Sequence, residues 1–159
     1  MSGTVHLMYG LAGAGKSTLA GELAARAPAV RFTLDQWMLR LYPELTIHDA
    51  AYGHRAETVR ELIWSIAEQV LVSGTDVVLD WNFWSTARRT WALERASSVA
   101  ATVILHRLST SLEESTHRAR EREAAGRTLA HRITRTGNDQ LARLMEEPTD
   151  DEGLTIVEH

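Results

Sequence analysis

The chain has 159 residues, with 17 Lys plus Arg against 21 Asp plus Glu, so its formal net charge is −4. This acidic balance argues against bulk nucleic-acid binding, which usually needs a basic surface. Sixteen of the basic residues are arginines and only one, Lys16, is a lysine. A base-recognition motif of the Asn-Lys-x-Asp type needs a further lysine, so the composition disfavours a GTPase.

Length and composition together predict a single globular domain over residues 1–159. A hydrophobic fraction of 44% and a charged fraction of 24% are ordinary, and no repeat or Gly/Ser linker divides the sequence. The absence of cysteine excludes disulfides, zinc-thiolate sites and thiol catalysis, and it favours a cytoplasmic protein. The first residues lack a signal-peptide pattern, and no apolar run approaches the ~20 residues of a membrane helix.

Strand-like and helix-like patterns alternate along the chain. The predicted strands cover residues 4–9, 30–34, 77–79, 102–105 and 154–157. The predicted helical segments cover residues 16–26, 36–41, 51–72, 85–100, 111–125 and 139–146. The strands at 77–79 and 102–105 are unbroken apolar runs, as expected for parallel strands covered on both faces. The alternation predicts an α/β fold with a parallel sheet of five strands, flanked by helices and joined by right-handed crossovers.

The helix expected at 51–72 is the clearest element, because its apolar residues recur three and four positions apart and form one stripe. The residues of this stripe are Val59, Leu62, Ile63, Ile66 and Val70. Two later helices carry N-terminal capping signals. Ser85 can cap the helix that follows it, and Ser111 with Glu114 matches a capping box.

Residues 10–17 fit the phosphate-binding pattern G-x-x-x-x-G-K-[ST], the Walker A motif, without mismatch. An apolar strand precedes the motif and a helix-forming run follows it, as this loop (the P-loop) requires. Its glycines let the backbone wrap phosphates, and the helix N-terminus adds a favourable dipole. We expect Lys16 to reach the outer phosphates and Ser17 to supply an oxygen to Mg²⁺. The expected nucleotide-binding residues are Gly10, Ala12, Gly13, Ala14, Gly15, Lys16, Ser17, Thr18 and, from the lid described below, Arg118.

Two acidic residues close apolar strands. Asp35 ends the run 31–35 and Asp80 ends the run 77–80, and ligands of parallel sheets bind at the carboxyl ends of strands. Phosphoryl transfer needs one carboxylate to activate an acceptor hydroxyl and another acid to hold Mg²⁺. We assign Asp80, with Ser17, to Mg²⁺ and Asp35 to the acceptor, and the reverse assignment stays open. Helix capping by Asp35 and a solvated position for Asp80 are the alternatives without chemistry.

Arginines concentrate in the second half of the chain, where eleven of the sixteen lie between residues 88 and 143. Arg118 and Arg122 are four residues apart and share a helix face, and Arg127 follows in a loop. They predict a short, Arg-rich lid at about residues 118–135 that stabilises the charge of a transferred phosphoryl group. A solvated helix with local ion pairs, such as Glu114 with Arg118, is the alternative.

Aromatic residues gather beside both acids. Core packing is their usual role, but a pocket for a ring or an apolar body would use them as well. Arg88 and Arg89 follow the second cluster, where they could bind an acidic substrate or lie on a helix surface. The candidate substrate residues are Asp35, Trp37, Trp81, Phe83, Trp84 and Arg89.

At residues 10–17, Asp35, the segment 79–85 and Arg118-x-x-x-Arg122, the chain resembles small P-loop kinase-like ATP-binding proteins. These are often labelled AAA-type ATPases and are similar to zeta-toxin, chloramphenicol phosphotransferase and polynucleotide kinase P-loop domains. The resemblance covers nearly the whole chain and implies a P-loop NTPase fold. It also implies that Asp35 is the acceptor-side acid, that the lid holds both arginines, and that the segment around Pro148 lies near adenine. Asn82 departs from the family, since many members have Gly there, and this departure is expected to alter the substrate side.

These features predict a kinase that transfers the γ-phosphate of ATP, with Mg²⁺, to a hydroxyl of a small molecule such as an antibiotic, a sugar or a nucleoside-like metabolite. Its expected catalytic residues are Lys16, Asp35, Arg118 and Arg122. A 5′-hydroxyl polynucleotide kinase and a nucleotide-binding regulator or toxin-type protein with little turnover are the alternatives. We expect a monomer or homodimer that partners a small molecule, not nucleic acid or a membrane. GTP as the donor is not excluded.

Overall fold

The structure, a computed structural model, describes residues 1–126 and 135–159. Its strands are β1 (Thr4–Tyr9), β2 (Ala29–Thr33), β3 (Asp76–Asn82), β4 (Thr102–Arg107) and β5 (Thr155–Glu158). Its helices are α1 (Lys16–Arg26), α2 (Leu34–Leu41), α3 (Tyr52–Val72), α4 (Thr86–Ser98), α5 (Leu112–Ala124) and α6 (Arg135–Leu144), followed by a 3₁₀ turn at Asp150–Glu152. The strand–helix alternation expected from the sequence is therefore confirmed.

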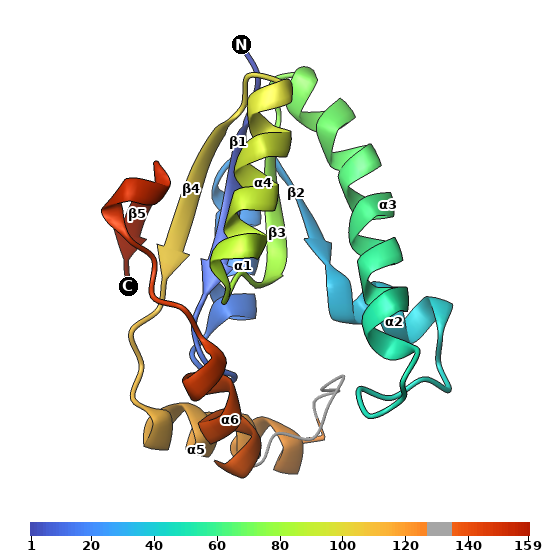
Figure 1. The fold of residues 1–159 in the computed structure, drawn as a ribbon, viewed down its shortest axis with the longest axis vertical. Helices are drawn as coiled ribbons and strands as arrows, with labels where there is room; N and C mark the ends of the chain where they lie inside the picture. Colours follow the sequence, from blue (N-terminus) through green and yellow to red (C-terminus); the bar gives the residue numbers. More distant parts are fainter. Residues whose placement is uncertain (127–134) are drawn as a thin grey trace.

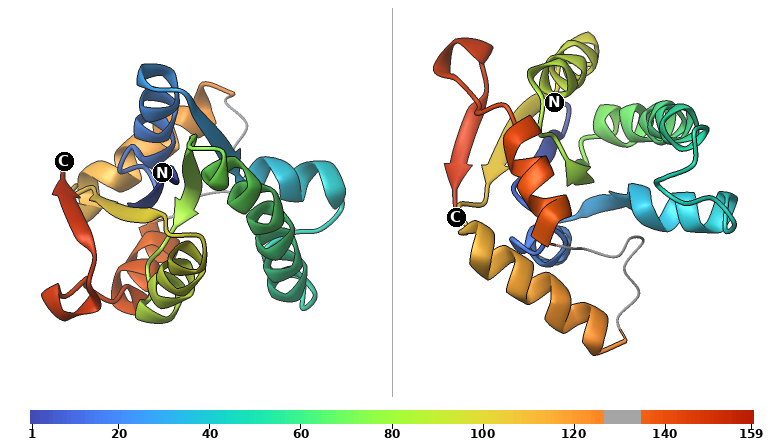
Figure 2. Two further views of the ribbon diagram at one scale, coloured as in Figure 1. Left: turned by 90° about the horizontal axis from the view of Figure 1, so that it is seen from above. Right: turned by 60° about the horizontal axis from the view of Figure 1, so that its bottom comes forward.

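The five strands form one sheet in the order β2-β3-β1-β4-β5, and every neighbouring pair is parallel. Helix α1 covers one face of the sheet, and α3 and α4 cover the other (Figures 1 and 2). Helices α5 and α6 lie beyond the carboxyl ends of the strands (Figure 1). From the central strand β1 the chain first builds one side of the sheet and later the other. The segment after β1 thus occupies the switch point where parallel sheets bind ligands.

The larger apolar cluster lies on the α3 and α4 side of the sheet and includes Val5, Leu7, Leu79, Phe83 and Leu105, all fully buried. On the α1 side, Met8, Ala20 and Val78 form a smaller cluster. Strands β1 and β3 therefore bury side chains on both faces, which explains the unbroken apolar run at 77–79 in β3. Neither α3 nor any other helix in the described residues combines the length and apolarity needed to cross a membrane.

The apolar stripe predicted on α3 is partly wrong. Val59 and Ile63 are buried, but Leu62 and Ile66 are 47% and 38% exposed. The helix is rotated so that small and aromatic side chains complete its inner face instead. That face consists of Ala56, Val59, Ile63, Trp64, Ala67 and Leu71. Alanines add little to an apolar pattern, but their small side chains let the helix approach the sheet closely. The apolar pattern therefore predicted the helix correctly but its rotation about its axis only approximately.

Both acids lie slightly away from the strand tips where the sequence put them. Strand β3 continues to Asn82, so Asp80 lies within the strand and is buried. Strand β2 ends at Thr33, and Asp35 lies in the first turn of α2 without capping it. Both serines cap their helices: the Oγ atoms of Ser85 and Ser111 accept hydrogen bonds from the backbone N–H groups of Arg88 and Glu114. The Glu114 carboxylate pairs with Arg118 instead of completing the expected capping box.

Candidate active site

The loop between β1 and α1 has the backbone conformation that a phosphate cradle needs. Gly13 and Gly15 have φ angles of 84° and 100°, in the left-handed region that other residues rarely adopt. No side chain caps the N-terminus of α1. Because the first-turn N–H groups of a helix have no intrahelical partners, those of Lys16, Ser17 and Thr18 are available to an anion. The loop therefore fits the phosphates of a nucleotide.

Lys16 joins the two ends of this loop. Its Nζ donates to the backbone oxygens of Gly10 at 2.8 Å and Leu11 at 2.7 Å. Burial lowers the pKa of the ammonium group to about 8, and the guanidinium of Arg122 acts in the same direction, while the carboxylates of Asp80 and Asp35 raise it. Charged groups from α2, β3 and α5 thus act on one ammonium group, which the fold has brought to the centre of the site.

This lowered pKa is testable because the chain has no other lysine. At pH 8 about half of the Lys16 amines should be unprotonated and reactive, whereas an ordinary lysine with a pKa of 10.5 would be almost fully protonated. Brief acetylation at a series of pH values, followed by mass spectrometry of the peptide carrying residue 16, should give a midpoint near pH 8. Bound Mg·ATP should protect the amine. A midpoint near 10.5 would contradict the assignment.

Asp80 is held by four hydrogen bonds in the sheet. Its Oδ1 accepts from Ser17 Oγ at 3.2 Å, and its Oδ2 accepts from Arg31 Nε at 3.0 Å, Arg31 Nη2 at 2.5 Å and Thr33 Oγ1 at 3.3 Å. The hydroxyl of Ser17 and a carboxylate oxygen lie side by side, which is the oxygen pair that Mg²⁺ uses in P-loop sites. Sequence reasoning missed Arg31, although it stands two residues before Thr33, which pairs with Asp80 in the sheet register.

Asn82 fastens the start of the loop. Its Oδ1 accepts from the Gly10 N–H at 3.3 Å, and its Nδ2 donates to the Gly10 carbonyl at 2.8 Å. The sequence pointed to Asn82 as a departure on the substrate side. The structure instead shows that its side chain acts on the phosphate loop, where glycine could make neither bond.

Helices α5 and α6 hold the apex of the loop. Asn138, buried on α6, accepts from the Ala12 N–H at 3.2 Å and donates to the Ala12 carbonyl at 3.0 Å and to Thr116 Oγ1 at 3.2 Å. A Cβ atom on Gly13 would lie 2.0 Å from the backbone oxygen of Ser115, so α5 rests directly on the loop. No local pattern indicated Asn138, because its partners are 126 and 22 residues away.

The two lid arginines have different surroundings. Arg118 is half-exposed and forms an ion pair with Glu114, one turn earlier on α5. Arg122 lies close enough to Lys16 to lower its pKa. The solvated ion pair that the sequence offered as the alternative thus describes Arg118, whereas the charge of Arg122 acts on the lysine of the phosphate loop. Arg127 and the rest of the expected lid between residues 127 and 134 lie outside the described residues.

Asp35 is exposed on the first turn of α2, and its negative charge raises the pKa values of Lys16 and Tyr52. It therefore lies between the phosphate loop and Tyr52 of α3. Trp37, two residues further along α2, packs edge-on against Phe32 with ring centroids 6.2 Å apart. Because its ring packs against the core, Trp37 is a packing residue here and not a ring that is free to stack on a substrate.

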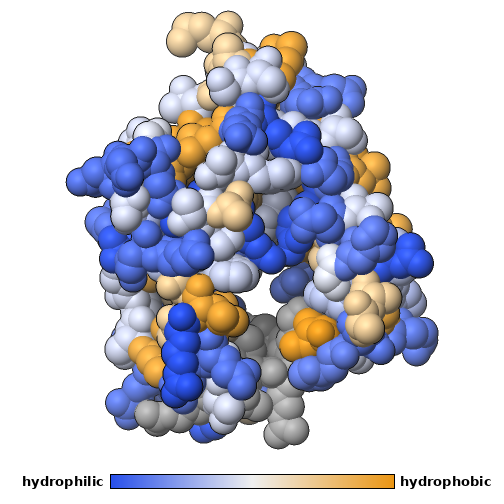
Figure 3. All heavy atoms as spheres, viewed as in Figure 1, coloured by the Kyte–Doolittle hydropathy of each residue, from blue (hydrophilic) through white to orange (hydrophobic). Residues whose placement is uncertain are grey.

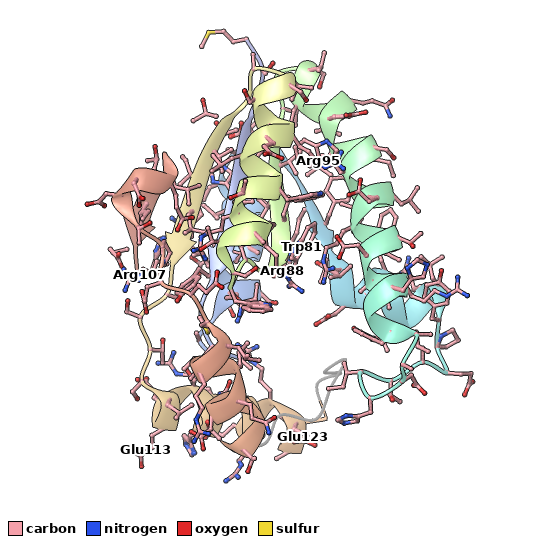
Figure 4. All side chains as sticks on the ribbon, viewed as in Figure 1. Trp81, Arg88, Arg95, Arg107, Glu113 and Glu123 are labelled. Atoms are coloured by element: carbon pink, nitrogen blue, oxygen red, sulfur yellow. The ribbon has the colours of Figure 1, made fainter. Side chains whose placement is uncertain are left out.

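A cavity of about 330 Å³ opens between α3, α4 and the end of β3. Its lining residues are Glu57, Arg60, Trp81, Phe83, Ser85, Ala87, Arg88 and Trp91. Trp81 stacks on Phe83 with centroids 5.4 Å apart, so two of the candidate substrate residues form one apolar wall. Trp84 lies outside this lining, with the guanidinium of Arg88 5.1 Å from its ring centroid. Figure 4 shows Trp81 and Arg88 together near the lower end of α4, above the hollow seen in Figure 3.

Arg89 is fully buried, and all five of its N–H groups have partners within the protein. They donate to both carboxylate oxygens of Glu152, to the backbone oxygens of Phe83 and Glu146, and to Thr86 Oγ1. No donor remains for a ligand. The expectation that Arg89 binds substrate is therefore incompatible with the structure, and the neighbouring Arg88 is the arginine that faces the cavity.

A second cavity of about 370 Å³ lies on the other side of the phosphate loop, between the ends of β1 and β4 and helix α6. Gly10, Leu11 and Leu108 line it together with Met145 and Glu147, which directly precede Pro148. This is the region in which the resemblance placed adenine.

Solved structures with the same fold include several kinases. A candidate kinase from Chloroflexus aurantiacus J-10-fl superposes with a TM-score of 0.75 at 21% identity, with 99% of this chain and 89% of that chain covered. The Mycobacterium tuberculosis APS kinase CysC, in complex with AMPPNP and APS, gives 0.65 at 20% identity, covering 99% and 88%. A gluconokinase from Sinorhizobium meliloti 1021 gives 0.59 at 14% identity, covering 99% and 82%. The fold is thus that of P-loop kinases.

No curated protein matches the sequence. A family described as AAA domain matches residues 5–148, which include the phosphate loop, both acids and helices α5 and α6. The match spans nearly the whole chain, and the phosphate loop at the switch point of a five-stranded parallel sheet agrees with it. The chain belongs to this AAA domain family.

Proposed function

We propose that the protein is a kinase that transfers the γ-phosphate of ATP to a hydroxyl group of a small molecule. The observation that carries this proposal is the electrostatic convergence on Lys16. Asp35 from α2, Asp80 from β3 and Arg122 from α5 all influence the ammonium group of a well-formed phosphate loop. A nucleotide-binding regulator would need the loop but would not need an additional acid and an arginine whose charges act on its lysine.

The donor side has the groups that a nucleotide requires. Loop amides and Lys16 would hold the phosphates, and Ser17 with Asp80 would hold Mg²⁺. The cavity of about 370 Å³ beside the loop would take the nucleoside. Bound Mg·ATP supplies an activated phosphoryl group, and the residues of this chain position it and balance its charge.

On the acceptor side, Asp35 would accept the proton of the attacking hydroxyl, and Arg122 would stabilise the negative charge that develops during transfer. The exposure of Asp35 suits contact with a second substrate. The kinase names of the structural neighbours support this class of reaction. They leave the acceptor open, since the identities of 14–21% extend only to the fold.

Asp35→Asn should lower kcat by about 10²–10⁴-fold, because the amide cannot accept the hydroxyl proton. The Kd for ATP should change little, since the phosphate loop is intact. A screen of hydroxyl compounds with ATP, read by mass spectrometry as gain of one phosphate, would first identify an acceptor, and its steady-state kinetics would then be compared between variants. Asp49→Asn is the matched control, because Asp49 is an exposed acid that hydrogen-bonds within its own loop.

Undiminished product formation by Asp35→Asn would contradict this role. If Asp80→Asn abolishes proton transfer while Asp35→Asn alters only the Mg²⁺ requirement, the two acids have the reverse roles. Transfer of labelled phosphate to the 5′ end of an oligonucleotide, without transfer to any small molecule, would instead support a polynucleotide kinase.

A further inference from the structure

Two arginines meet at the aromatic cavity between α3 and α4. Arg60 comes from α3 and Arg88 from α4, and both line the cavity. Burial, together with the positive charge of Arg60, lowers the pKa of Arg88 to about 10, and the carboxylate of Glu57 opposes this only in part. Two positive charges therefore lie near each other in a partly desolvated place, which is unfavourable unless a negatively charged group lies between them.

Arg60 has hydrogen-bonding capacity that the protein does not use. Its side chain is only 11% exposed, and Nη1 donates to Glu57 Oε2 at 2.6 Å. Its Nε is buried without a partner and is one of two buried side-chain polar atoms in that condition among the described residues. Buried polar groups in native proteins are nearly always paired, so an unpaired one marks a place for a water, an ion or a ligand.

Arg88 is also incompletely paired. One hydrogen bond runs from its Nη1 to the backbone oxygen of Asn82 at 3.3 Å, and its guanidinium lies over the ring of Trp84. The contrast with Arg89, whose five N–H groups all have partners, separates a structural arginine from one that keeps donors for a ligand. The charged residues lining the cavity are Arg60, Arg88 and Glu57. One carboxylate offsets one of the two guanidinium charges, so the lining has a formal net charge of +1.

The rest of the lining is mainly apolar and aromatic. Trp81 and Phe83 stack on each other, and Trp91 is fixed from behind by an edge-on contact with Trp64 and by a hydrogen bond from its Nε1 to Glu61. Rigid rings of this kind receive a planar or apolar body, while guanidinium groups recognise oxyanions with paired N–H donors.

We propose, on the basis of the proposed kinase function, that this cavity is the acceptor subsite and that the acceptor carries an oxyanion beside a planar or apolar body. Arg60 and Arg88 hold the oxyanion, which is a phosphate, sulfate or carboxylate, and the aromatic wall holds the body. Neutral sugars and alcohols are selected against, because they would leave the two guanidinium groups desolvated and without a counter-charge.

Binding can be measured without turnover. Trp81 and Trp91 line the cavity and report on it through intrinsic fluorescence. The protein is first saturated with Mg·ADP, so that added anions do not occupy the phosphate loop. It is then titrated with phenyl phosphate, phenyl sulfate and benzoate, and with phenol as the neutral counterpart. We expect saturable quenching by at least one anion and weaker binding of phenol by about tenfold or more. The order of the three anions identifies the oxyanion.

Arg60→Gln and Arg88→Gln should each weaken binding of the preferred anion by about tenfold or more and leave phenol unaffected. Arg26→Gln is the control, because it removes the same charge from an exposed arginine on α1. Arg88→Lys should recover only part of the affinity, since lysine lacks the paired donors. Thermal melting of each variant establishes that it is folded. Equal weakening by Arg26→Gln, or unchanged anion binding in both cavity variants, overturns the proposal.

The outcomes separate this proposal from the kinase function itself. Phosphorylation of a neutral acceptor at an unchanged rate by Arg88→Gln would reject the oxyanion subsite and leave the kinase assignment standing. Arginine-dependent binding of an anion, with no compound phosphorylated, would leave the subsite standing and reject the kinase assignment.

Discussion

Lys16→Ala is expected to lower the rate of phosphoryl transfer by at least roughly 10²–10³-fold. The ammonium group is the compact positive charge nearest to the transferred group, and no second lysine can replace it. The substitution also removes the hydrogen bonds from Nζ to the Gly10 and Leu11 carbonyls, which hold the two ends of the loop together. Steady-state turnover with the acceptor found in the screen, and calorimetric Kd values for ATP, would measure both effects.

The control for charge is Lys16→Arg. Arginine keeps the positive charge, but its broad planar fork does not fit a place shaped for an ammonium group. We therefore expect Lys16→Arg to retain most of the loss in rate. If Lys16 acted only through its long-range charge, Lys16→Arg would restore the rate. Near-normal turnover by Lys16→Ala, in protein whose melting curve is unchanged, would remove the kinase assignment.

Local patterns predicted the position of the loop between β1 and α1, because its residues are contiguous and the strand and helix on either side are short-range features. The same holds for Ser85 and Ser111, whose caps involve residues three positions away. Five parallel strands followed from simple alternation. These are features whose physical causes act within one or two turns of chain.

What the sequence could not give are contacts between distant segments. Asn82 bonds to Gly10 across 72 residues, and Asn138 bonds to Ala12 across 126. Contacts over such separations produce no local sequence pattern. Because asparagine is common in polar loops, its presence alone does not indicate a structural role either. The unpaired Nε of Arg60 was equally invisible, because it depends on how closely α3 packs against α4 and β3.

Arg88 and Arg89 show this limit most clearly. They are adjacent, and consecutive helical residues point about 100° apart, so only one of them can face the cavity. The sequence favoured Arg89 as the substrate residue. In the structure, Arg89 lies on the side of α4 that packs against the carboxyl-terminal segment, where it donates to Glu152 and to the Glu146 carbonyl. Arg88 therefore lies beside the aromatic wall of the cavity.

Arg89→Met should destabilise the protein by about 3–5 kcal/mol, the usual cost of breaking a buried ion pair by removing one partner. The carboxylate of Glu152 would remain largely buried without its guanidinium, and two backbone oxygens would lose their donors. Urea denaturation measures the change. Arg95→Gln on the same helix is the control, since its half-exposed pair with Glu61 should contribute about 1 kcal/mol or less.

The double variant Arg89→Met/Glu152→Gln should regain part of the stability, because the uncompensated charge is gone. Hydrogen bonds from Arg89 lower the pKa of Glu152, so this pair stabilises the native state above the ordinary glutamate pKa and less so as the pH falls through the lowered value. Acid should therefore reduce the stability difference between wild type and Arg89→Met. A difference below about 1 kcal/mol at pH 7 would show that the pair contributes little net stability.

Because Arg89 joins α4 to the segment that contains Glu147, a wall of the proposed nucleoside cavity, the Arg89→Met variant should also bind ATP more weakly.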